Sequence, residues 1–511
     1  MCGIVGAVAQ RNIVGVLIEG LKRLEYRGYD SSGLSFLDEK GEICVYKNTG
    51  KVKNLINSLA ASSASGFSGI AHTRWATHGV PSEVNAHPHQ SSGVTVVHNG
   101  IIENHVELRQ EMQEQGYVFV SDTDTEVVAH LIHYYFSSLS SLKGAVQKTV
   151  ARLQGAYALG VMCAREPGTL IGARSGSPLV LGLGVAENFI ASDQMALRQV
   201  TDRFIFLEEG DLVELRDSSY QLIDILGETA EREIVTISSA DEIADKGDYD
   251  HYMLKEIFEQ PEMLKATLQG RISEKHVLPE AFGTEAPAIF SKTESVHIVA
   301  CGTSYHAGLI AKYWLEEWTG ILCQVEVASE YRYRTCVVPE NTLFVTVSQS
   351  GETADTLAAL QAAKKAGYLA SLVICNVANS SLVRASDLVL MTYAGPEIGV
   401  ASTKAFTTQL AALQLFCIGL GRSHGLEQKK EQQLIEALHQ LPELSRKTLE
   451  LSSAIEKTFQ SFADKNHALF LGRGVQFPVA LEGALKLKEI SYVHAEAYPA
   501  GELKHGPLAL I

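Results

Sequence analysis

Several features that mark common protein classes are missing from this sequence of 511 residues. No Lys/Arg-rich run interrupts a chain whose formal net charge is -16 at pH 7, so a nucleic-acid backbone would repel it. No uninterrupted apolar run approaches the roughly 18 residues that a membrane span needs, and the first residues lack the basic segment of a secretory signal. We therefore expect a cytoplasmic protein that binds neither nucleic acid nor membrane.

Motifs for metals, disulfides and nucleotide cofactors are missing as well. The eight cysteines are scattered without a CxxC pair, and the histidines between positions 72 and 98 match no metal-ligand spacing. Neither GxGxxG nor GxxxxGK[ST] occurs, which argues against dinucleotide and P-loop sites. The sequence predicts reduced thiols, no metal and no cofactor.

What is present is the composition of an ordinary globular enzyme, too long for a single core. Short β-branched runs separated by Gly, Asn and Asp fill the first half, which indicates a mixed α+β fold. Apolar strands alternate with helices in the second half, which indicates α/β structure with parallel sheets. The predicted segments are a first domain at 2–240, a helical linker at 241–290, an α/β domain at 291–430, a helical connection at 431–465 and a last segment at 466–511.

The last segment resembles the beginning of the α/β domain. At an offset of 172 residues, Gly302 lies over Gly474 and Glu330 over Glu502, with no gap between them. We interpret this as an internal repeat. The counterpart of the SQSGET motif at 348–353 would fall after Ile511, so the second copy is expected to be incomplete.

The N-terminus, MCGIVGAVAQ, places Cys2 directly after the initiator methionine. A buried structural cysteine on a short strand is one interpretation. The other is a nucleophile: without Met1, Cys2 would carry a thiol and an α-amine whose pKa of about 7.7 to 8.0 suits a general base. This second interpretation requires that Met1 be removed.

Three further motifs in the first half could serve such a nucleophile. Asn99 and Gly100 in VVHNGIIEN could form an oxyanion hole, although Asn-Gly also favours a tight turn. Arg74 suits a carboxylate and Asp124 suits an ammonium group, so the pair could hold an α-amino acid. The alternatives are a surface ion pair for Arg74 and a helix N-cap for the SDTDTE segment that contains Asp124.

In this order, MCGIVG, LEYRGYDSSG, HTRWATHG, HNGIIEN and SDTDTE resemble the N-terminal-nucleophile glutamine amidotransferase domain, known as class II. The resemblance implies an αββα sandwich that releases ammonia from glutamine through a thioester. The roles it implies are Cys2 as nucleophile, Asn99 and Gly100 as oxyanion hole, Arg74, Asp124, Thr77 and His78 as glutamine-binding residues, and Trp75 as a gate for ammonia.

The second half offers an anion site without a lysine. SQSGET lies between a strand and a helix, where side chains and helix N-terminal N–H groups converge; a plain N-cap is the alternative. CGTSY follows the preceding strand. Together with EIGVASTKAFTTQ these loops resemble the sugar isomerase (SIS) fold, from about Ser295 to the end. The sugar-phosphate-binding residues so implied are Thr303, Ser304, Ser348, Gln349, Ser350, Thr353, Val400 and Ser402.

One predicted helix near the end carries Glu482, Lys486 and Glu489 on a single face. Glu and Lys at this spacing often form a surface pair. The resemblance instead implies that Glu489 moves a proton between C1 and C2 of a sugar, that His505 assists ring opening, and that Lys486 lies nearby.

A glutaminase domain before SIS lobes resembles a family of homodimeric enzymes that make glucosamine 6-phosphate from glutamine and fructose 6-phosphate, the first step of amino-sugar synthesis. In that family a C-terminal tail supplies a lysine, which this sequence lacks; we expect the chain to retain glutaminase activity and little synthesis. One alternative is a phosphosugar-binding regulatory protein with a vestigial glutaminase domain. A phosphoribosyl acceptor would need an acidic diphosphate-binding loop, which the second half does not offer.

Overall fold

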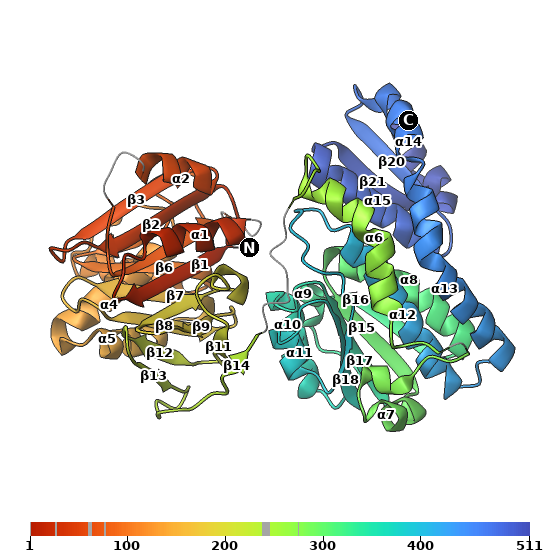
Figure 1. Cartoon of the computed structure of the whole chain (residues 1–511), viewed down its shortest axis with the longest axis horizontal. Coiled ribbons are helices and arrows are strands. Elements are labelled where there is room, and N and C mark those ends of the chain that lie inside the picture. The colour runs from red at the N-terminus through yellow and green to blue at the C-terminus, as the bar shows by residue number, and fades with distance from the viewer. Residues whose placement is uncertain (1, 26–27, 60–63, 76–77, 238–245, 274) are drawn as a thin grey trace. The chain divides into compact units, whose positions relative to one another are not determined.

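The chain forms two compact units, Met1–Glu242 and Ile243–Ile511, and each is described by itself (Figure 1). The computed structural model describes residues 2–25, 28–59, 64–75, 78–237, 246–273 and 275–511. The predicted boundary at residues 240 and 241, and the predicted site residue Thr77, lie outside the described residues. The domain limits drawn from the sequence stay a prediction.

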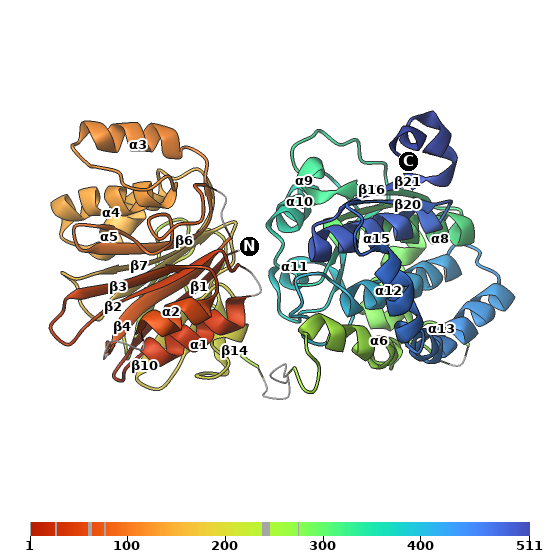
Figure 2. The ribbon, with the colours of Figure 1, turned by 90° about the horizontal axis from the view of Figure 1, so that it is seen from above.

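The first unit has four layers, with helices outside two facing antiparallel sheets (Figure 2). The predicted αββα sandwich is confirmed. In its described part the first sheet has the order β14-β11-β9-β10-β1-β4-β2-β3 and the second β13-β12-β8-β7-β6-β5. The strands of the first sheet are β1 (Gly3–Ala9), β2 (Ser31–Leu37), β3 (Ile43–Thr49), β4 (Ser68–Arg74), β9 (Val180–Leu183), β10 (Glu187–Ala191), β11 (Arg203–Phe206) and β14 (Val235–Thr236). Those of the second are β5 (His89–Ser91), β6 (Val94–Ile102), β7 (Gly155–Cys163), β8 (Leu170–Ser175), β12 (Leu212–Leu215) and β13 (Tyr220–Ile223).

Strand β1 lies at the centre of this sandwich because both of its faces are apolar. Val5 and Ala7 belong to the core beneath the outer helices, whereas Ile4 and Val8 belong to the core between the two sheets. Burial on both faces explains the continuous apolar run after Cys2. The outer helices are α1 (Val14–Leu24) and α2 (Val52–Leu59) on the first sheet, and α3 (His105–Glu114), α4 (Thr125–Leu139) and α5 (Leu142–Val150) on the second.

The second unit is built around a parallel sheet, as the sequence predicts. Over the described residues its order is β16-β15-β17-β18-β19. Val296 and Ile298 of β15 face one helical layer, and Val299 faces the other, so alternate side chains fill two cores. The strands are β15 (Ser295–Ala300), β16 (Leu322–Val327), β17 (Thr342–Ser348), β18 (Ala370–Cys375) and β19 (Leu388–Met391).

Helices cover both faces of this sheet. One layer contains α9, α10 and α11, and the other contains α8 and α12 with α6 and α13 outside them (Figure 1). Leu264 of α6 reaches the core, so the segment predicted as a helical linker packs within this unit. The helices are α6 (Tyr252–Leu268), α7 (Ala286–Lys292), α8 (Gly302–Thr319), α9 (Ala328–Tyr331), α10 (Ala354–Lys364), α11 (Ser381–Ala385), α12 (Lys404–Arg422), α13 (Gln428–Leu449) and α14 (Ser452–Phe459).

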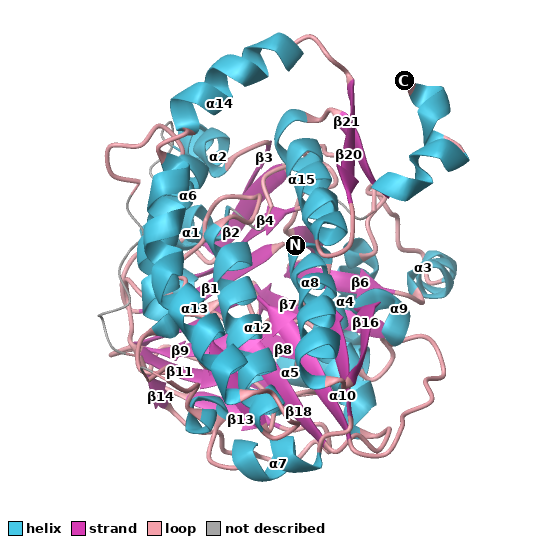
Figure 3. Cartoon of the chain, turned by 90° about the vertical axis from the view of Figure 1, so that its right-hand side faces the viewer, coloured by secondary structure: helices cyan, strands magenta, loops and turns pink. Residues whose placement is uncertain are grey.

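The internal repeat is confirmed. β20 (His467–Gly472) and β21 (His494–Pro499) are parallel, with α15 (Gln476–Ser491) between them along the chain (Figure 3). These strands coincide with β15 and β16 at the predicted offset of 172 residues, and they pair in the same register, since Ser295 faces Leu322 and His467 faces His494.

Two further observations concern membrane-spanning helices and the cysteines. In the described parts of the chain, no helix is both long and apolar enough to span a bilayer. All eight cysteines are free.

Candidate active sites

The Cys2 thiol lies against the backbone of Trp75. Because Gly3 pairs with Thr73, the start of β1 is adjacent to the end of β4. The Trp75 N–H donates to Cys2 Sγ at 3.3 Å, and Sγ lies 3.5 Å from the Trp75 carbonyl oxygen. Burial raises the pKa of the Cys2 thiol, while the Trp75 hydrogen bond opposes that rise. A thiol held protonated in this way needs a base before it can attack.

Asn99 and Gly100 lie within strand β6, so the alternative prediction of a tight turn is wrong. Asn99 pairs with Ala158 and Gly100 with Tyr157 on β7. Gly100 has φ +130°, and a Cβ there would lie 1.9 Å from the Ala156 carbonyl oxygen. Only glycine fits this position. The Asn99 Nδ2 donates to the Cys2 carbonyl at 3.1 Å, which brings the predicted oxyanion donor to the predicted nucleophile.

His72 holds the other end of the Asn99 amide. Its Nε2 lies 3.0 Å from Asn99 Oδ1 in a fully buried environment. Burial lowers the pKa of His72 to about 3, so the ring is neutral and its Nε2–H is the donor. This bond orients the Asn99 NH₂ group toward Cys2. The sequence predicts a supporting role at most for His72; its place two residues before Arg74, on the same face of β4, was the available signal.

Arg74 is buried, so a surface ion pair is the wrong interpretation. One guanidinium nitrogen, NH2, donates to the carbonyl oxygens of His78 and, at 3.3 Å, Gly79. The other, NH1, is buried without a hydrogen-bond partner in the described part of the chain. A buried guanidinium nitrogen without an acceptor is costly, which is expected where a ligand carboxylate supplies the acceptor.

Asp124 stands at the N-cap position of α4, but its side chain makes no capping bond. Instead Oδ2 accepts from the Ile102 N–H at 2.9 Å, and the carboxylate is 4% exposed. Glu126 anchors the preceding loop by accepting from the Ser121 and Val120 N–H groups at 2.7 and 2.9 Å. Although burial opposes ionisation of Glu126, the nearby His130 and the hydrogen bonds from Val120 and Ser121 lower its pKa to about 2.

Two other predicted residues of this half flank the site. Trp75 is 46% exposed, and its ring stands edge-on to Tyr29 with the ring centres 5.2 Å apart. The His78 ring stands edge-on to His105 at 5.0 Å. Their roles as ammonia gate and glutamine-binding residue stay predictions.

The predicted sugar-phosphate loops meet at one edge of the parallel sheet. Ala300 at the end of β15 pairs with Val347 near the end of β17. The segment before α8 and the loop between β17 and α10 therefore leave the sheet side by side. Within the second loop, Ser348 Oγ accepts from the Gly351 N–H at 3.0 Å, and Ser350 Oγ accepts from the Glu352 N–H at 3.2 Å. Thr353 is the N-cap residue of α10, without a capping bond from its side chain.

Gly351 keeps this loop close to α11. Its φ is +67°, and a Cβ there would lie 1.9 Å from Ser380 Oγ. Gln349 accepts from the Asn376 N–H at 3.3 Å through its carbonyl oxygen. These contacts hold the backbone of the loop in one conformation, which is what an anion site made of N–H groups and hydroxyls needs.

Glu482 of α15 joins the second copy of the repeat to the first. Its carboxylate accepts from Thr303 Oγ1 at 2.9 Å and lies 2.8 Å from His306 Nδ1. Lys486 contacts both Glu482, at 3.6 Å, and Glu489. The three α15 side chains therefore share one helix face as predicted, and because Glu482 is 5% exposed its pair with Lys486 is no surface pair.

The remaining predicted residues of this half make other contacts or are exposed. Ser304 accepts from Gln409 Nε2 on α12 at 3.0 Å. Ser402 Oγ donates to Glu397 at 3.0 Å, whereas Val400 is exposed. His505 ends a short 3-10 helix (Ala500–His505) and is also exposed. The roles predicted for them stay predictions.

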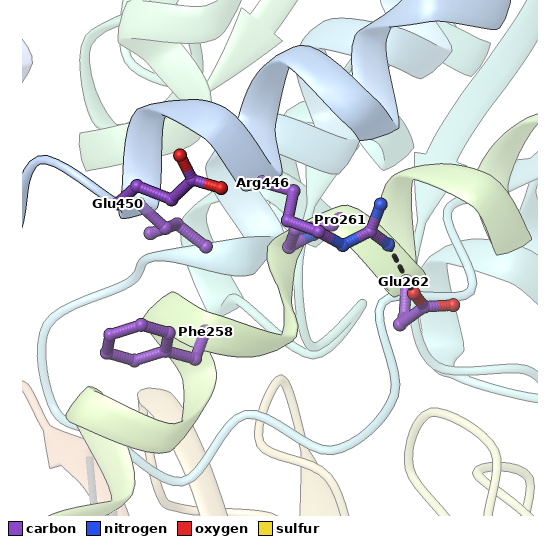
Figure 4. A pocket seen from close by; sticks show the side chains of 6 residues that line it. Phe258, Pro261, Glu262, Arg446 and Glu450 are labelled. Carbon is purple, nitrogen blue, oxygen red and sulfur yellow. Dashed lines mark hydrogen bonds and ion pairs between the residues drawn. The ribbon is translucent and has the colours of Figure 1, made fainter.

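Two hollows lie away from every predicted residue. One, of about 240 Å³, lies between α6 and α13, where Arg446 is paired with Glu262 at 2.8 Å (Figure 4). The other, of about 440 Å³, is polar and is lined by residues that include Ser91, Tyr117 and His130. Neither contains the side chains that a glutaminase or a sugar isomerase needs.

Comparison with known proteins finds a different known domain in each of the two units. A model of the glutamine amidotransferase domain matches residues 72–199, and a model of the SIS domain matches residues 289–419 and 461–511. The match to the SIS model therefore falls on both copies of the repeat.

Full-length relatives are similar over the whole chain. The glutamine–fructose-6-phosphate aminotransferase (isomerizing) of Pseudomonas putida is 60% identical over 513 residues, covering 100% of this chain and 84% of the relative. The protein of the same name from Vibrio vulnificus is 56% identical over 512 residues, with the same coverage. A solved structure of the C-terminal domain of glucosamine-fructose-6-phosphate aminotransferase from Francisella tularensis is 52% identical and covers 52% of this chain and 75% of that one, with a TM-score of 0.52.

Proposed function

The chain belongs to the family of glutamine–fructose-6-phosphate aminotransferases (isomerizing), and from this premise we propose that it makes glucosamine 6-phosphate from glutamine and fructose 6-phosphate. The observation that carries the proposal is the contact between Cys2 and Asn99: the amide that would stabilise an oxyanion already binds the residue that bears the thiol.

In the proposed first step, Cys2 Sγ attacks the side-chain amide carbon of glutamine. The thiol proton passes to the α-amine of Cys2, which is free once Met1 is removed. Asn99 Nδ2 and the Gly100 N–H stabilise the negative oxygen, and loss of one such donor costs about 10²–10³-fold in kcat in comparable enzymes. The C–N bond breaks, ammonia leaves with the proton, and water hydrolyses the thioester to glutamate.

Substrate orientation follows from two buried charges. The free NH1 of Arg74 would bind the α-carboxylate of glutamine, and the Asp124 carboxylate would bind its α-ammonium group. Thr77 and His78 are proposed to complete this site, and Trp75 to gate the path of ammonia. A buried charge pair of opposite sign selects an α-amino acid over a simple amide.

In the second unit, the first turn of α8, with Thr303 and Ser304, and the segment 348–353 are proposed to bind the phosphate group of fructose 6-phosphate. Val400 and Ser402 would contact the sugar. Lys486 lies between two carboxylates and holds Glu489 in place, so Glu489 can take a proton from C1 of the sugar and return one to C2. His505 would assist ring opening.

We further propose that the enzyme acts in the cytoplasm as a homodimer, with no nucleic-acid or membrane partner, and that its domains follow the limits predicted from the sequence. The exposed position of His505 is compatible with a site shared between subunits. Sedimentation equilibrium tests the dimer: a mass that corresponds to one chain at assay concentrations would contradict it.

The reaction itself is tested by incubation with glutamine, with and without fructose 6-phosphate, while glutamate and glucosamine 6-phosphate are quantified. We expect glutamate in both cases and amino sugar only with fructose 6-phosphate; substantial amino sugar would overturn the expectation of little synthesis drawn from the sequence. Absence of glutamate from a sample whose intact mass shows that Met1 is removed would contradict the glutaminase proposal. Glutamate without amino sugar would contradict the proposal that this chain makes glucosamine 6-phosphate, but not the glutaminase proposal.

A further inference from the structure

A cluster of potential metal ligands lies on the α9 side of the parallel sheet, apart from the sugar-phosphate loops. His297 on β15, Glu326 on the edge strand β16 and Cys336 after α9 approach one another, and their ligand atoms all lie within 4.8 Å. The set comes from three separate segments. His297 is 2% exposed, whereas the other two side chains reach the surface in part.

The His297 ring is held in the orientation that a ligand histidine needs. Its Nδ1 lies 2.7 Å from the Tyr368 hydroxyl, which itself accepts from Tyr331 at 3.2 Å. Metal-binding histidines usually donate their second ring N–H to such a partner. The opposite nitrogen, Nε2, therefore points at Glu326 and Cys336.

That nitrogen has no aligned hydrogen bond among the described residues. His297 Nε2 lies 3.0 Å from Glu326 Oε1, at ion-pair distance, but the contact does not have the geometry of a hydrogen bond. A buried ring nitrogen without an aligned hydrogen bond is costly. A cation between the imidazole and the carboxylate would satisfy both groups.

A cationic side chain already lies at the open side of the cluster. Arg334 pairs with Glu326 through two nitrogens and lies 3.4 Å from Cys336 Sγ. Its side chain is 44% exposed, so it can rotate into solvent. The guanidinium is thus a replaceable counter-ion for two of the three ligand groups.

The second copy of the repeat shows that the βαβ fold does not require this cluster. At the offset of 172 residues, His297 corresponds to Leu469, Glu326 to Tyr498 and Cys336 to Leu508. The same strands form in the same register without any of the three ligand types. The cluster therefore needs an explanation other than folding of the motif.

We propose that His297 Nε2, Glu326 Oε1 and Cys336 Sγ bind a divalent cation of borderline softness, Zn²⁺. Nitrogen, oxygen and sulfur ligands together favour Zn²⁺ over Mg²⁺ or Ca²⁺, which prefer oxygen alone. On binding, the Cys336 thiol loses its proton to solvent and the Arg334 guanidinium moves away. The charges of the carboxylate and thiolate then balance the charge of the ion, and water occupies a fourth position.

Such an ion would cross-link three segments of the chain. It would tie the chain segment after α9 to β15 and to the edge strand β16, and thereby stabilise the second unit. The site is independent of the proposed catalytic groups, so its failure and the failure of the proposed function are distinguishable.

The test is metal binding by the full-length protein after removal of metals with a chelator. We expect one high-affinity Zn²⁺ per chain, measured by mass spectrometry after dialysis, and a thiolate-to-metal absorption band with Co²⁺ as probe. Cys336→Ser and His297→Gln should each abolish the band and the stoichiometric ion. Tyr368→Phe should weaken Zn²⁺ about 10- to 100-fold, because it removes the partner of Nδ1.

Arg334→Gln gives the discriminating result. Removal of the competing guanidinium should tighten Zn²⁺ binding, whereas it would have no effect on an ion bound elsewhere. Cys44→Ser and His439→Gln are matched controls, because Cys44 is on β3 of the other unit and His439 is an exposed residue of α13. Two results would overturn the proposal. One is that Cys336→Ser retains Zn²⁺ and the Co²⁺ band, and the other is that Arg334→Gln binds Zn²⁺ more weakly. If His297→Gln fails to fold, the variants Cys336→Ser and Arg334→Gln, at less buried positions, still decide it.

Discussion

The two candidate sites are built in different ways. In the first unit, Asn99 and Asp124 are buried: His72 of β4 and the Cys2 carbonyl before β1 hold Asn99, and the Ile102 N–H of β6 holds Asp124. In the second unit, the loop hydroxyls mainly stabilise their own loop, and the carboxylates come from α15 in the other copy of the repeat. The first site is formed within one sandwich, whereas the second depends on the contact between two copies of one motif.

This difference predicts that glutamine hydrolysis and sugar-phosphate binding can be impaired separately. The first site contains all of its proposed groups within its own unit, and α15 contributes only to the second. Variants in the first unit should therefore leave sugar-phosphate binding unchanged, and variants in the second unit should leave glutamine hydrolysis unchanged.

The largest expected effect comes from Cys2→Ala. Loss of a covalent nucleophile costs on the order of 10⁶-fold in kcat in comparable enzymes, so glutamate release should fall to background. Fructose 6-phosphate affinity, measured by calorimetry, should not change. Glutamate release that persists in the purified variant would remove Cys2 from the mechanism; a parallel loss of sugar-phosphate binding would contradict the independence of the sites.

A smaller effect is expected from His72→Phe, which keeps an aromatic ring but removes the donor to Asn99. Without that hydrogen bond the Asn99 amide can turn its oxygen toward Cys2, and kcat for glutamine should fall about 10- to 100-fold with little change in KM. His72→Gln, which restores a donor, should recover part of the rate. His133→Phe on α4 is the control. An increase in KM with unchanged kcat would assign His72 to substrate binding instead.

Glu482→Gln tests the dependence of the second site on α15. The variant keeps the side-chain volume but loses the charge that Thr303, His306 and Lys486 contact, so fructose 6-phosphate affinity should fall about tenfold, or about 1.4 kcal/mol. The control is Glu317→Gln on the exposed side of α8. Equal affinities in the two variants would show that α15 does not support the phosphate loop; altered glutamine hydrolysis would contradict the separation of the sites.

Acid stability gives an effect of similar size near pH 5.5. Burial lowers the pKa of His72 to about 3 from its ordinary 6.5, so the unfolded chain binds a proton that the folded chain excludes between these values. The contribution of this neutral histidine to the free energy of unfolding is therefore fully present above pH 6.5 and is lost as the pH falls toward 3. At pH 5.5 the loss is about 1.4 kcal/mol for one such histidine.

The same cause acts on His87, His89 and His98 in the first unit and on His297 in the second. We therefore expect the first unit to lose protection against hydrogen exchange at a higher pH than the second when the protein is acidified. Simultaneous loss in both units, or earlier loss in the second, would contradict this expectation.

Much of the fold could be predicted because its signals are local or periodic. Alternating apolar runs predict the parallel sheet, and the offset between Gly302 and Gly474 predicts the positions of β20 and β21. The contacts of Glu482 could not be predicted, because its partners are separated from it by more than 170 residues and lie on another helix.

Asn99 and Gly100 illustrate why local preference fails. An Asn-Gly pair alone favours a turn, but pairing of β6 with β7 along its length outweighs that preference. What makes glycine necessary at position 100 is the carbonyl oxygen of Ala156 on the neighbouring strand, which no sequence pattern indicates. The chemical roles of the site residues come from resemblance and stay proposals until they are tested.

The hydrogen bond from Ile102 to Asp124 has one more consequence. Asn99 and Ile102 are three residues apart on one strand, or about 10 Å at the usual rise, so the strand fixes the spacing between the amide donor and the carboxylate. In the proposed reaction this spacing selects substrates by the distance between the side-chain amide and the α-ammonium group. Asparagine, which is one methylene shorter than glutamine, cannot reach both ends at once and should be discriminated against about 10- to 200-fold in kcat/KM.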